Sequence, residues 1–274
     1  MEREFLDIEV EGVRLRVAAM HRDGPRAPVV LLHGFGSTKE DYADVAGYPQ
    51  FDGRPILAFD APGCGETDCA DLSALSIPFL QQTAARVLER YGLRRFHLVG
   101  HSMGGLTALA YARAHPDRPL SFVDIEGNLA PEDCFLSRQV ADYPAESPAA
   151  FLEAFIERLR RRPGFSHPLY AAGLRGKVRC EAVAPIFRSM VALSDGGGLL
   201  DGFLGLPFPR MFVYGSENRA LSYLPVLREA GVELAEIPES GHFPMYANPP
   251  ALWTRIGAFL DGAEEEDPAD GRKP

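Results

Sequence analysis

The sequence predicts an α/β protein with a mostly parallel β-sheet. Short apolar segments of strand length alternate with helix-like segments along the chain, which is the pattern of strands joined by helices. Several apolar segments run directly into turns that contain glycine or proline. One of them, at residues 95–99, runs into a serine flanked by glycines and then into a helix-like segment. Because ligands of such sheets bind beyond the carboxyl ends of the strands, we expect the functional site at these turns.

The predicted elements follow in chain order. A hairpin is expected from residues 5–10 and 13–20, with its turn at residues 11–12. Five apolar strands come next, at residues 29–33, 55–59, 96–100, 120–125 and 210–214. A short strand at 232–236 and a helix at about 249–260 complete the C-terminal part. The stretch from 127 to 207 contains no convincing buried strand and at least three helix-like segments, at 131–143, 148–162 and 181–193.

The pentapeptide Gly100-His101-Ser102-Met103-Gly104 is the most informative stretch of the chain. A strand-to-helix turn this tight strains the serine backbone, and the flanking glycines provide room for it. The turn exposes Ser102 Oγ at the end of the sheet and points the N-terminus of a helix at whatever binds there. Ser102 is therefore the candidate nucleophile. The alternative is an ordinary turn in which the serine only caps the helix.

Backbone N–H groups for a developing oxyanion are expected from two loops. The first parallel strand ends in H-G-F-G at residues 33–36. In a fold with a nucleophile elbow, the loop after this strand donates one N–H and the residue after the nucleophile donates the other. We assign these donors to Phe35 and Met103. His33 is expected to brace the loop, and Asp60, in a glycine- and proline-rich turn, to tie down its own loop.

The candidate general base is His242, which lies in the segment S-G-H-F-P near the C-terminus. Gly241 and Pro244 mark this segment as a loop between a predicted strand and a predicted helix. Of the seven histidines, His242 is the one in a late glycine-histidine loop, which is where the base of such an arrangement comes from. His101 neighbours the nucleophile, but we expect it to point elsewhere on the turn.

Four motifs, in the order H-G-F-G, F-D-A-P-G-C-G-E-T, G-H-S-M-G-G and S-G-H-F-P, resemble those of the α/β-hydrolase superfamily. The resemblance covers nearly the whole chain except its middle and its C-terminal tail. It implies an eight-stranded, mostly parallel sheet with helices on both faces, a Ser-His-acid triad, and a helical cap inserted after the sixth strand. Since the candidate nucleophile is a serine, the chain departs from the dehalogenase and epoxide-hydrolase branches, which carry an aspartate there.

The acid of the implied triad is absent from its commonest place. Most relatives carry an aspartate three residues after the glycine that ends the seventh strand, and here that residue is Asn218, which cannot hold a negative charge against an imidazolium. In some α/β-hydrolases, including a subgroup of the haloalkane dehalogenases, the acid follows the sixth strand, and the segment from residue 126 is similar to theirs. We therefore assign Glu126 as the acid that orients His242. Asp124 and Glu217 are the alternatives, and a helix-capping role for Glu126 is the competing interpretation.

The chain thus divides into a core of residues 1–126 and 207–262, a helical cap of residues 127–206, and a disordered acidic tail of residues 263–274. The cap should cover the strand ends, exclude water and shape the pocket. Its apolar residues suggest a mainly hydrophobic substrate, although we expect most of them to pack the cap against the core. These residues are Phe135, Phe151, Phe155, Tyr170, Phe187, Met190 and Phe203. His167 and Tyr170 are candidate polar groups of the pocket.

Composition and charge argue against several classes of partner. The chain has 274 residues and a net charge of −10, which disfavours nucleic acid or an anionic membrane because both attract clustered positive charge. The one basic cluster, residues 158–162, ends a predicted helix, where cations suit the dipole. The four cysteines show neither metal-ligand nor disulfide spacing. With no N-terminal signal and no membrane-spanning apolar run in the sequence, a cytoplasmic location is expected.

The residues and the resemblance together predict acyl transfer to water. Ser102, activated by His242, would attack an ester-like carbonyl of a small molecule, and water would then release the acid. No metal or organic cofactor is expected, and the oligomeric state is left open. Carboxylic-ester hydrolysis is the first choice, with thioester, lactone or carbon–carbon bond hydrolysis as alternatives. Acyl transfer to another acceptor, cyclisation, or a receptor with little turnover are the remaining alternatives.

Overall fold

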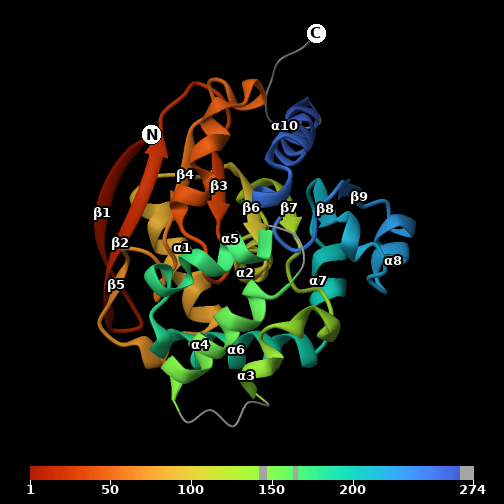
Figure 1. Ribbon diagram of the computed structural model, residues 1–274. Helices are drawn as coiled ribbons and strands as arrows, with labels where there is room; N and C mark the ends of the chain where they lie inside the picture. The colour runs from red at the N-terminus through yellow and green to blue at the C-terminus, as the bar shows by residue number, and fades with distance from the viewer. Residues whose placement is uncertain (142–146, 163–165, 266–274) are drawn as a thin grey trace.

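The computed structural model describes residues 1–141, 147–162 and 166–265. Its centre is a sheet in which eight strands follow the order β1-β2-β4-β3-β6-β7-β8-β9, and Figure 1 shows helices around these strands. The neighbouring pairs from β4-β3 to β8-β9 are parallel, whereas β2 is antiparallel to β1 and β4. The predicted eight-stranded, mostly parallel sheet is confirmed. A two-residue strand, β5 (Asp68–Cys69), also pairs with β2 and is an addition that the sequence pattern does not predict.

The strands form close to the predicted segments because those segments are apolar enough to be buried on both faces of the sheet. Every residue of the central strands β3 and β4 is buried, as expected for parallel strands that are covered by helices. The bounds of the eight strands are β1 (Glu2–Val10), β2 (Val13–Arg22), β3 (Val29–Leu32), β4 (Ile56–Phe59), β6 (Phe96–His101), β7 (Pro119–Ile125), β8 (Arg210–Gly215) and β9 (Glu233–Ile237).

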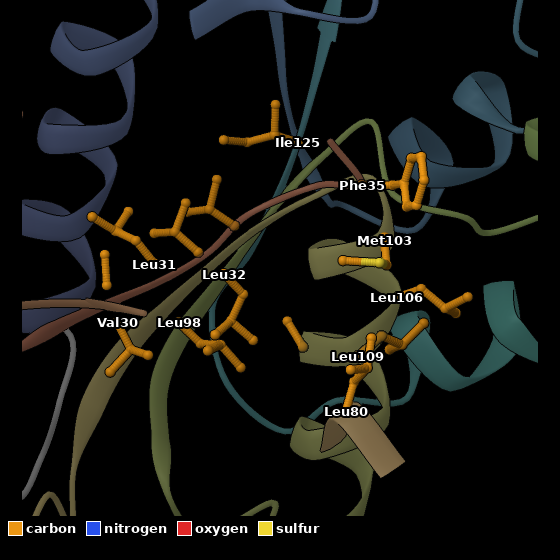
Figure 2. Packing of buried hydrophobic residues seen from close by; sticks show 14 of the residues in the cluster. Val30, Leu31, Leu32, Phe35, Leu80, Leu98, Met103, Leu106, Leu109 and Ile125 are labelled. Carbon is orange, nitrogen blue, oxygen red and sulfur yellow. The ribbon is translucent and has the colours of Figure 1, made fainter. Parts of the chain in front are cut away.

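Helices of the core pack on the strands through apolar side chains. Figure 2 shows Leu32 and Leu98 of the sheet facing Leu109 of one helix and Leu80 of another, while Leu31 points to the opposite side. All five side chains belong to one buried hydrophobic cluster. The helices of the core are α1 (Ile77–Arg90), α2 (Met103–Ala114), α8 (Leu224–Glu229), α9 (Pro244–Ala247) and α10 (Pro249–Glu265), with shorter 3-10 helices η1 (Lys39–Gly47), η2 (Pro49–Phe51), η3 (Leu72–Ala74) and η5 (Ser216–Asn218).

The segment between β7 and β8 is helical, and we use the word cap for its described part within residues 127–206. It contains η4 (Pro131–Phe135), α3 (Arg138–Ala141), α4 (Pro148–Arg160), α5 (Ser166–Lys177), α6 (Cys180–Asp195) and α7 (Leu199–Leu204). In Figure 1, the green and teal helices of the cap, α3, α4 and α6, lie together at the lower end of the molecule. The inserted segment therefore follows β7, which is the sixth strand of the eight in the main sheet.

Two features of the cap differ from the prediction. A single helix at 131–143 is wrong, because a 3-10 turn ends at Phe135, a separate short helix begins at Arg138, and residues 142–143 lie outside the described chain. The carboxylate of Asp133 accepts hydrogen bonds from the N–H groups of Leu129 and Ala130, which fixes a turn in place of a continuous helix. Helices α5 and α7 are further additions, since their apolar pattern is interrupted by glycines that lower helix propensity.

The predicted boundary between the last helix and the tail is also wrong. Helix α10 continues through residues 263–265, which the sequence analysis places in a disordered tail, and residues 266–274 lie outside the described chain. Glu264 explains the difference, because its carboxylate pairs with the fully buried guanidinium of Arg54 and with Arg26. Hydrogen bonds from His97, Arg54 and Arg26 outweigh the effect of burial and lower the pKa of Glu264 to about 2, so that it stays charged. Within the described ranges, each helix is too short or too polar to cross a bilayer.

Candidate active site

Ser102 occupies the sharp turn between β6 and α2, in the strained conformation that its sequence context predicts. Its backbone has φ 52° and ψ −118°, a region that residues with a side chain rarely adopt. The neighbouring Gly104 is required by close approach, since a Cβ there would lie 2.1 Å from the carbonyl oxygen of Leu32. The Ser102 N–H donates to the carbonyl of Ile125 at 3.0 Å, which fixes the turn against the next strand. The hydroxyl is consequently presented at the carboxyl end of the sheet.

The structure brings Ser102, His242 and Glu126 into one hydrogen-bonded chain. His242 Nε2 lies 3.1 Å from Ser102 Oγ, and His242 Nδ1 lies 3.0 Å from a carboxylate oxygen of Glu126. With the ring proton on Nδ1 donated to Glu126, Nε2 is free to accept the hydroxyl proton of Ser102. Glu126 and His242 are both buried, whereas Ser102 is half-buried at the edge of a cavity. This is the geometry of a nucleophile, a base and an orienting carboxylate.

Glu126 is held in place by hydrogen-bond donors from the last residue of β8 and from the segment that follows it. The backbone N–H of Gly215 donates to one oxygen at 2.7 Å, and the side-chain amide of Asn218 donates to both oxygens at 2.8 and 2.7 Å. Glu126 also has a positive φ of 48°, which turns its side chain out of the strand direction and back toward His242. Asn218, rejected as the acid in the sequence analysis, therefore contacts the acid instead. Sequence reasoning missed this role, although its place three residues after Gly215 was a signal.

Neither alternative acid contacts the base. Asp124 is fully buried and accepts the N–H of Gly127 at 3.0 Å, and burial raises the pKa of its carboxyl well above the usual range. Glu217 lies beside Gly241 on the loop that carries His242. In the described chain, neither carboxylate forms a hydrogen bond to the imidazole of His242. No helix begins directly after Glu126, so a helix-capping role is excluded as well.

The two predicted oxyanion donors lie on either side of the serine turn. Met103 is the first residue of α2, so its N–H has no acceptor within the helix. Phe35 lies in the loop after β3, where the carbonyl of Gly34 accepts the N–H of Ser37. Within the described ranges, the N–H groups of Phe35 and Met103 have no protein acceptor. Both N–H groups are thus free of protein acceptors, as the prediction of two oxyanion donors requires.

The two histidines near the site are both neutral. His33 accepts the N–H of Ala61 at Nε2 and contacts the carbonyl of Gly34 through Nδ1, and burial lowers its pKa. It braces the loop, as expected. His101 Nε2 donates to the backbone carbonyl of His242 at 2.8 Å, and burial lowers the pKa of His101 well below its usual value. The expectation that His101 points away from the chemistry is wrong, because its ring supports the base loop and lines the cavity.

The cavity at Ser102 is small and mostly apolar. Its volume is about 20 Å³, which suits one water molecule. Phe135 stands edge-to-face against the His242 ring at 5.1 Å, and Phe187 does the same against Phe35 at 4.4 Å. A second pocket, which is more open and has a volume of about 530 Å³, is also lined by Phe135, and we call it the outer pocket. Phe135 therefore separates the outer pocket from the proposed chemical centre.

The cap contributes more residues to the cavity than expected. Four of the seven apolar cap residues named from the sequence line it: Phe135, Tyr170, Phe187 and Met190. The other three, Phe151, Phe155 and Phe203, are buried by packing. His167 does not line the cavity and instead lies edge-to-face against Phe243, whereas Asp133, which sequence reasoning missed, does line it. Burial raises the pKa of Asp133 to about 6.

The sheet order, the serine on a strand-to-helix turn and the histidine loop after the last strand define the protein as an α/β hydrolase in class. Residues 29–254 match the Alpha/beta hydrolase family. The chain belongs to this family, and the resemblance seen in the sequence is confirmed.

Relatives and similar structures carry several activities. The chain is 26% identical over 250 residues to 2-succinyl-6-hydroxy-2,4-cyclohexadiene-1-carboxylate synthase of Enterobacter sp. (strain 638), covering 85% of this chain and 91% of the relative. It is similar to a thermophilic esterase from Thermogutta terrifontis, with a TM-score of 0.75, 22% identity and coverage of 96% and 99%. A carboxylesterase structure from Nitrososphaera gargenis gives a TM-score of 0.76 at 16% identity, with coverage of 96% and 100%. At these identities, the likeness to the solved structures concerns the fold.

Proposed function

We propose that the protein is a serine hydrolase that cleaves a carboxylic ester, or a related acyl bond, of a mainly hydrophobic small molecule. The observation that carries this proposal is the chain of contacts from Ser102 Oγ through the His242 ring to Glu126, at 3.1 and 3.0 Å. The N–H groups of Phe35 and Met103, which have no protein acceptor within the described ranges, support it, because an oxyanion needs donors that are not already paired.

The proposed reaction has two halves. His242 Nε2 takes the proton from Ser102 Oγ as that oxygen forms a bond to the carbonyl carbon, and the carbonyl electron pair moves onto oxygen. When the tetrahedral centre collapses, the bond to the alcohol breaks and His242 returns the proton to the leaving oxygen. Water then attacks the acyl-serine with His242 as base, which releases the carboxylic acid and restores the Ser102 hydroxyl.

The surrounding groups stabilise the charges that develop. An imidazolium forms in each half, and the carboxylate of Glu126 stabilises it at hydrogen-bond distance. The N–H groups of Phe35 and Met103 stabilise the oxyanion, and losing one such donor typically costs about 2.7–4 kcal/mol of barrier. Since the donors are backbone groups fixed before the reaction, they need no reorganisation during it.

The cavity supports an apolar substrate that enters by displacing cap side chains. The side chains of Phe135, Phe187 and Met190 form much of its wall. A space of about 20 Å³ admits water but no acyl chain, so at least one of these side chains must move when substrate binds. We assign this movement to Phe135, which is 42% exposed and lines both the cavity and the outer pocket.

A second candidate function is bond-forming or bond-breaking chemistry at carbon with the same triad. A relative that matches over 85% of this chain is named as a synthase, which favours this candidate. Thioester and lactone hydrolysis, acyl transfer to another acceptor, and a receptor with little turnover complete the alternatives. These alternatives differ from ester hydrolysis in the products formed or in the rate of turnover. All of them are compatible with the hydrogen bond between Ser102 and His242, so this contact does not distinguish them.

Three further proposals concern the domain organisation, the partner and the location of the protein. We propose that residues 1–126 and 207–262, extended to 265, form the core and that residues 127–206 form the cap. The partner is a small molecule, and a net charge of −10 disfavours nucleic acid. The four cysteines are free, which suits a reducing compartment such as the cytoplasm.

A fluorophosphonate probe and a series of p-nitrophenyl esters test the proposed function. The wild type should be labelled at one residue and should turn over esters, and Ser102→Ala should lose both properties. Thr107→Ser, which retains the buried hydroxyl that donates to the Met103 carbonyl, is the control for a small change in the same helix. Labelling with slow ester turnover would favour the transfer or synthase candidates, and a wild type that takes no label at Ser102 would exclude all covalent mechanisms.

A further inference from the structure

Tyr170 is a cap residue that touches both loops of the candidate site. Its hydroxyl donates to the backbone carbonyl of Phe35 at 2.6 Å, and its ring stacks on Phe243 at 4.2 Å. Phe35 carries one of the proposed oxyanion donors, and Phe243 directly follows the proposed base. The side chain is buried, with 3% exposed. No other cap hydroxyl in the described chain donates to a backbone group of the oxyanion loop.

The contact is close enough to define the path of the loop. Gly36 has a φ of +75°, and a Cβ at this position would lie 2.4 Å from the Tyr170 hydroxyl oxygen and 2.3 Å from a Leu174 methyl group. The loop that contains Phe35 and Gly36 therefore packs directly against α5, with no room for a side chain at Gly36. A hydrogen bond to the Phe35 carbonyl limits rotation of the backbone at that residue, and so limits the direction in which its own N–H can point.

Helix α5 is a firm support for this hydrogen bond. After its last turn, the chain is tied to the core by backbone bonds from Gly65 N–H to the Lys177 carbonyl at 2.8 Å and from Arg179 N–H to the Gly63 carbonyl at 2.9 Å. The Lys177 ammonium also pairs with Asp41 at 2.8 Å. Tyr170 thus projects from a helix that is anchored on both the β3 side and the β4 side of the site.

We infer that Tyr170 is a positioning residue, which holds the N–H of Phe35 in the direction needed to bind the oxyanion. The inference rests on the proposed function and deepens it, because it makes part of the catalytic geometry depend on the cap. The requirement is physical: an oxyanion donor acts only when it lies at hydrogen-bond distance from the oxygen as charge develops. A misplacement of about 1 Å can cost on the order of 100-fold in rate.

The hydroxyl should act as a donor over the whole working pH range. Burial raises the pKa of Tyr170 well above its usual value, and the carboxylate of Asp41 on the neighbouring loop acts in the same direction. The neighbouring thiol of Cys64 and hydroxyl of Tyr246 are likewise un-ionised at neutral pH, since burial raises the pKa of Cys64 to about 12 and raises that of Tyr246. The contribution of Tyr170 should therefore not vary with pH.

The substitution Tyr170→Phe tests the inference, since it removes only the hydroxyl and leaves a ring to stack on Phe243. The matched control is Tyr91→Phe, which removes a half-buried hydroxyl that donates to the carboxylate of Glu4 in β1, outside the site. For each protein we would measure kcat and KM on a p-nitrophenyl ester, the inhibition constant of a boronic acid that forms a tetrahedral adduct on serine, and thermal unfolding.

Tyr170→Phe should lower kcat roughly 10-fold to 100-fold with little change in KM. The inhibition constant of the boronic acid should rise by a similar factor, and the loss should be the same from pH 6 to pH 9. Tyr91→Phe should lose its hydrogen bond to Glu4 and keep wild-type kinetics. A Tyr170→Phe enzyme with wild-type kcat, or with a raised KM alone, overturns the inference while the proposed function stands. A wild type that takes no fluorophosphonate label at Ser102 removes the proposed function, and the inference with it.

Discussion

All proposed catalytic groups come from the core, whereas the cap supplies most of the cavity wall. The core groups are held by polar contacts at fixed backbone positions: Glu126 accepts from Gly215 and Asn218, and the carbonyl of His242 accepts from His101. Most cap residues at the cavity contribute only apolar contact, as Phe135 and Phe187 do. The difference indicates that the chemistry depends on directional bonds, while the shape of the pocket depends on side chains that can change independently.

Tyr170 and Asp133 are exceptions to this division, since each is a cap residue that lines the cavity and has a directional bond to the core. If the comparison is right, substitutions in the core should change the rate for all substrates alike. Substitutions of apolar cap residues should instead change the preference among substrates.

His242→Gln should produce the largest loss, because the amide cannot take the proton of Ser102. We expect kcat on all esters to fall by about 10⁵-fold to 10⁶-fold. His167→Gln is the matched control, since His167 also lies against the Phe243 ring, at 5.7 Å, but has no contact with Ser102. Its kcat should stay near the wild-type value. Equal losses in the two variants would mean that His242 acts only through the structure of its loop.

Asn218→Ala should produce an intermediate loss that is uniform across substrates. It removes the amide that donates to both oxygens of Glu126, and a hydrogen bond to a charged group is worth about 1.5–3 kcal/mol. The steady-state kcat should fall about 10-fold to 100-fold if most of this energy is lost as imidazolium forms. Gln82→Ala is the control, because its amide donates to the carboxylate of Glu11 at 2.6 Å, in the turn between β1 and β2. A wild-type kcat for Asn218→Ala would show that the carboxylate needs no such support.

Phe135→Ala should change the preference among ester substrates, whereas it should not lower kcat for all of them alike. Removing this ring joins the cavity to the outer pocket, so kcat/KM should rise about 10-fold for octanoate relative to acetate esters. The measurement is the ratio of the two kcat/KM values. Phe5→Ala, at a similarly exposed phenylalanine on β1, should leave that ratio unchanged. A uniform loss on both esters would break the proposed division between core and cap.

Ser102→Gly should give the smallest effect, and it concerns stability. Both Ser102→Gly and Ser102→Ala lose the hydroxyl, but only glycine relaxes a backbone held at φ 52°. We expect the glycine variant to unfold at a temperature roughly 2 °C higher than the alanine variant, for a gain of about 1 kcal/mol. Differential scanning calorimetry can resolve this difference. An alanine variant of equal or higher stability would show that the turn is not strained.

Local motifs were enough to predict much of the core. The glycines around Ser102 indicate a tight turn, and the apolar segments indicate buried strands. The lack of an acid at residue 218 favours Glu126 as the acid of the triad that the family resemblance implies. These features depend on neighbours in sequence, where turn chemistry and periodicity are readable. The structure then placed Ser102, His242 and Glu126 in contact across 140 and 116 residues of chain.

The remaining features depend on partners that are distant in sequence. Tyr170 finds the Phe35 carbonyl 135 residues away, and Glu264 finds Arg54 at a separation of 210. Neither Tyr170 nor Glu264 belongs to a sequence motif. The residues next to them in the sequence therefore do not indicate their hydrogen-bond partners. The cap helices were harder for the same reason, because glycines weaken the pattern of α5 and α7 and tertiary packing decides their bounds.

The rate of Ser102 labelling by a fluorophosphonate tests the central claim most directly, because it measures how well the nucleophile is activated. Glu126→Gln should slow the second-order labelling rate by about 10⁴-fold, since the amide would no longer stabilise the imidazolium form of His242. Glu217→Gln, on the same side of the base loop, should label at the wild-type rate. A Glu126→Gln protein that labels as fast as the wild type would contradict the assignment of Glu126, and with it the proposed Ser102–His242–Glu126 triad.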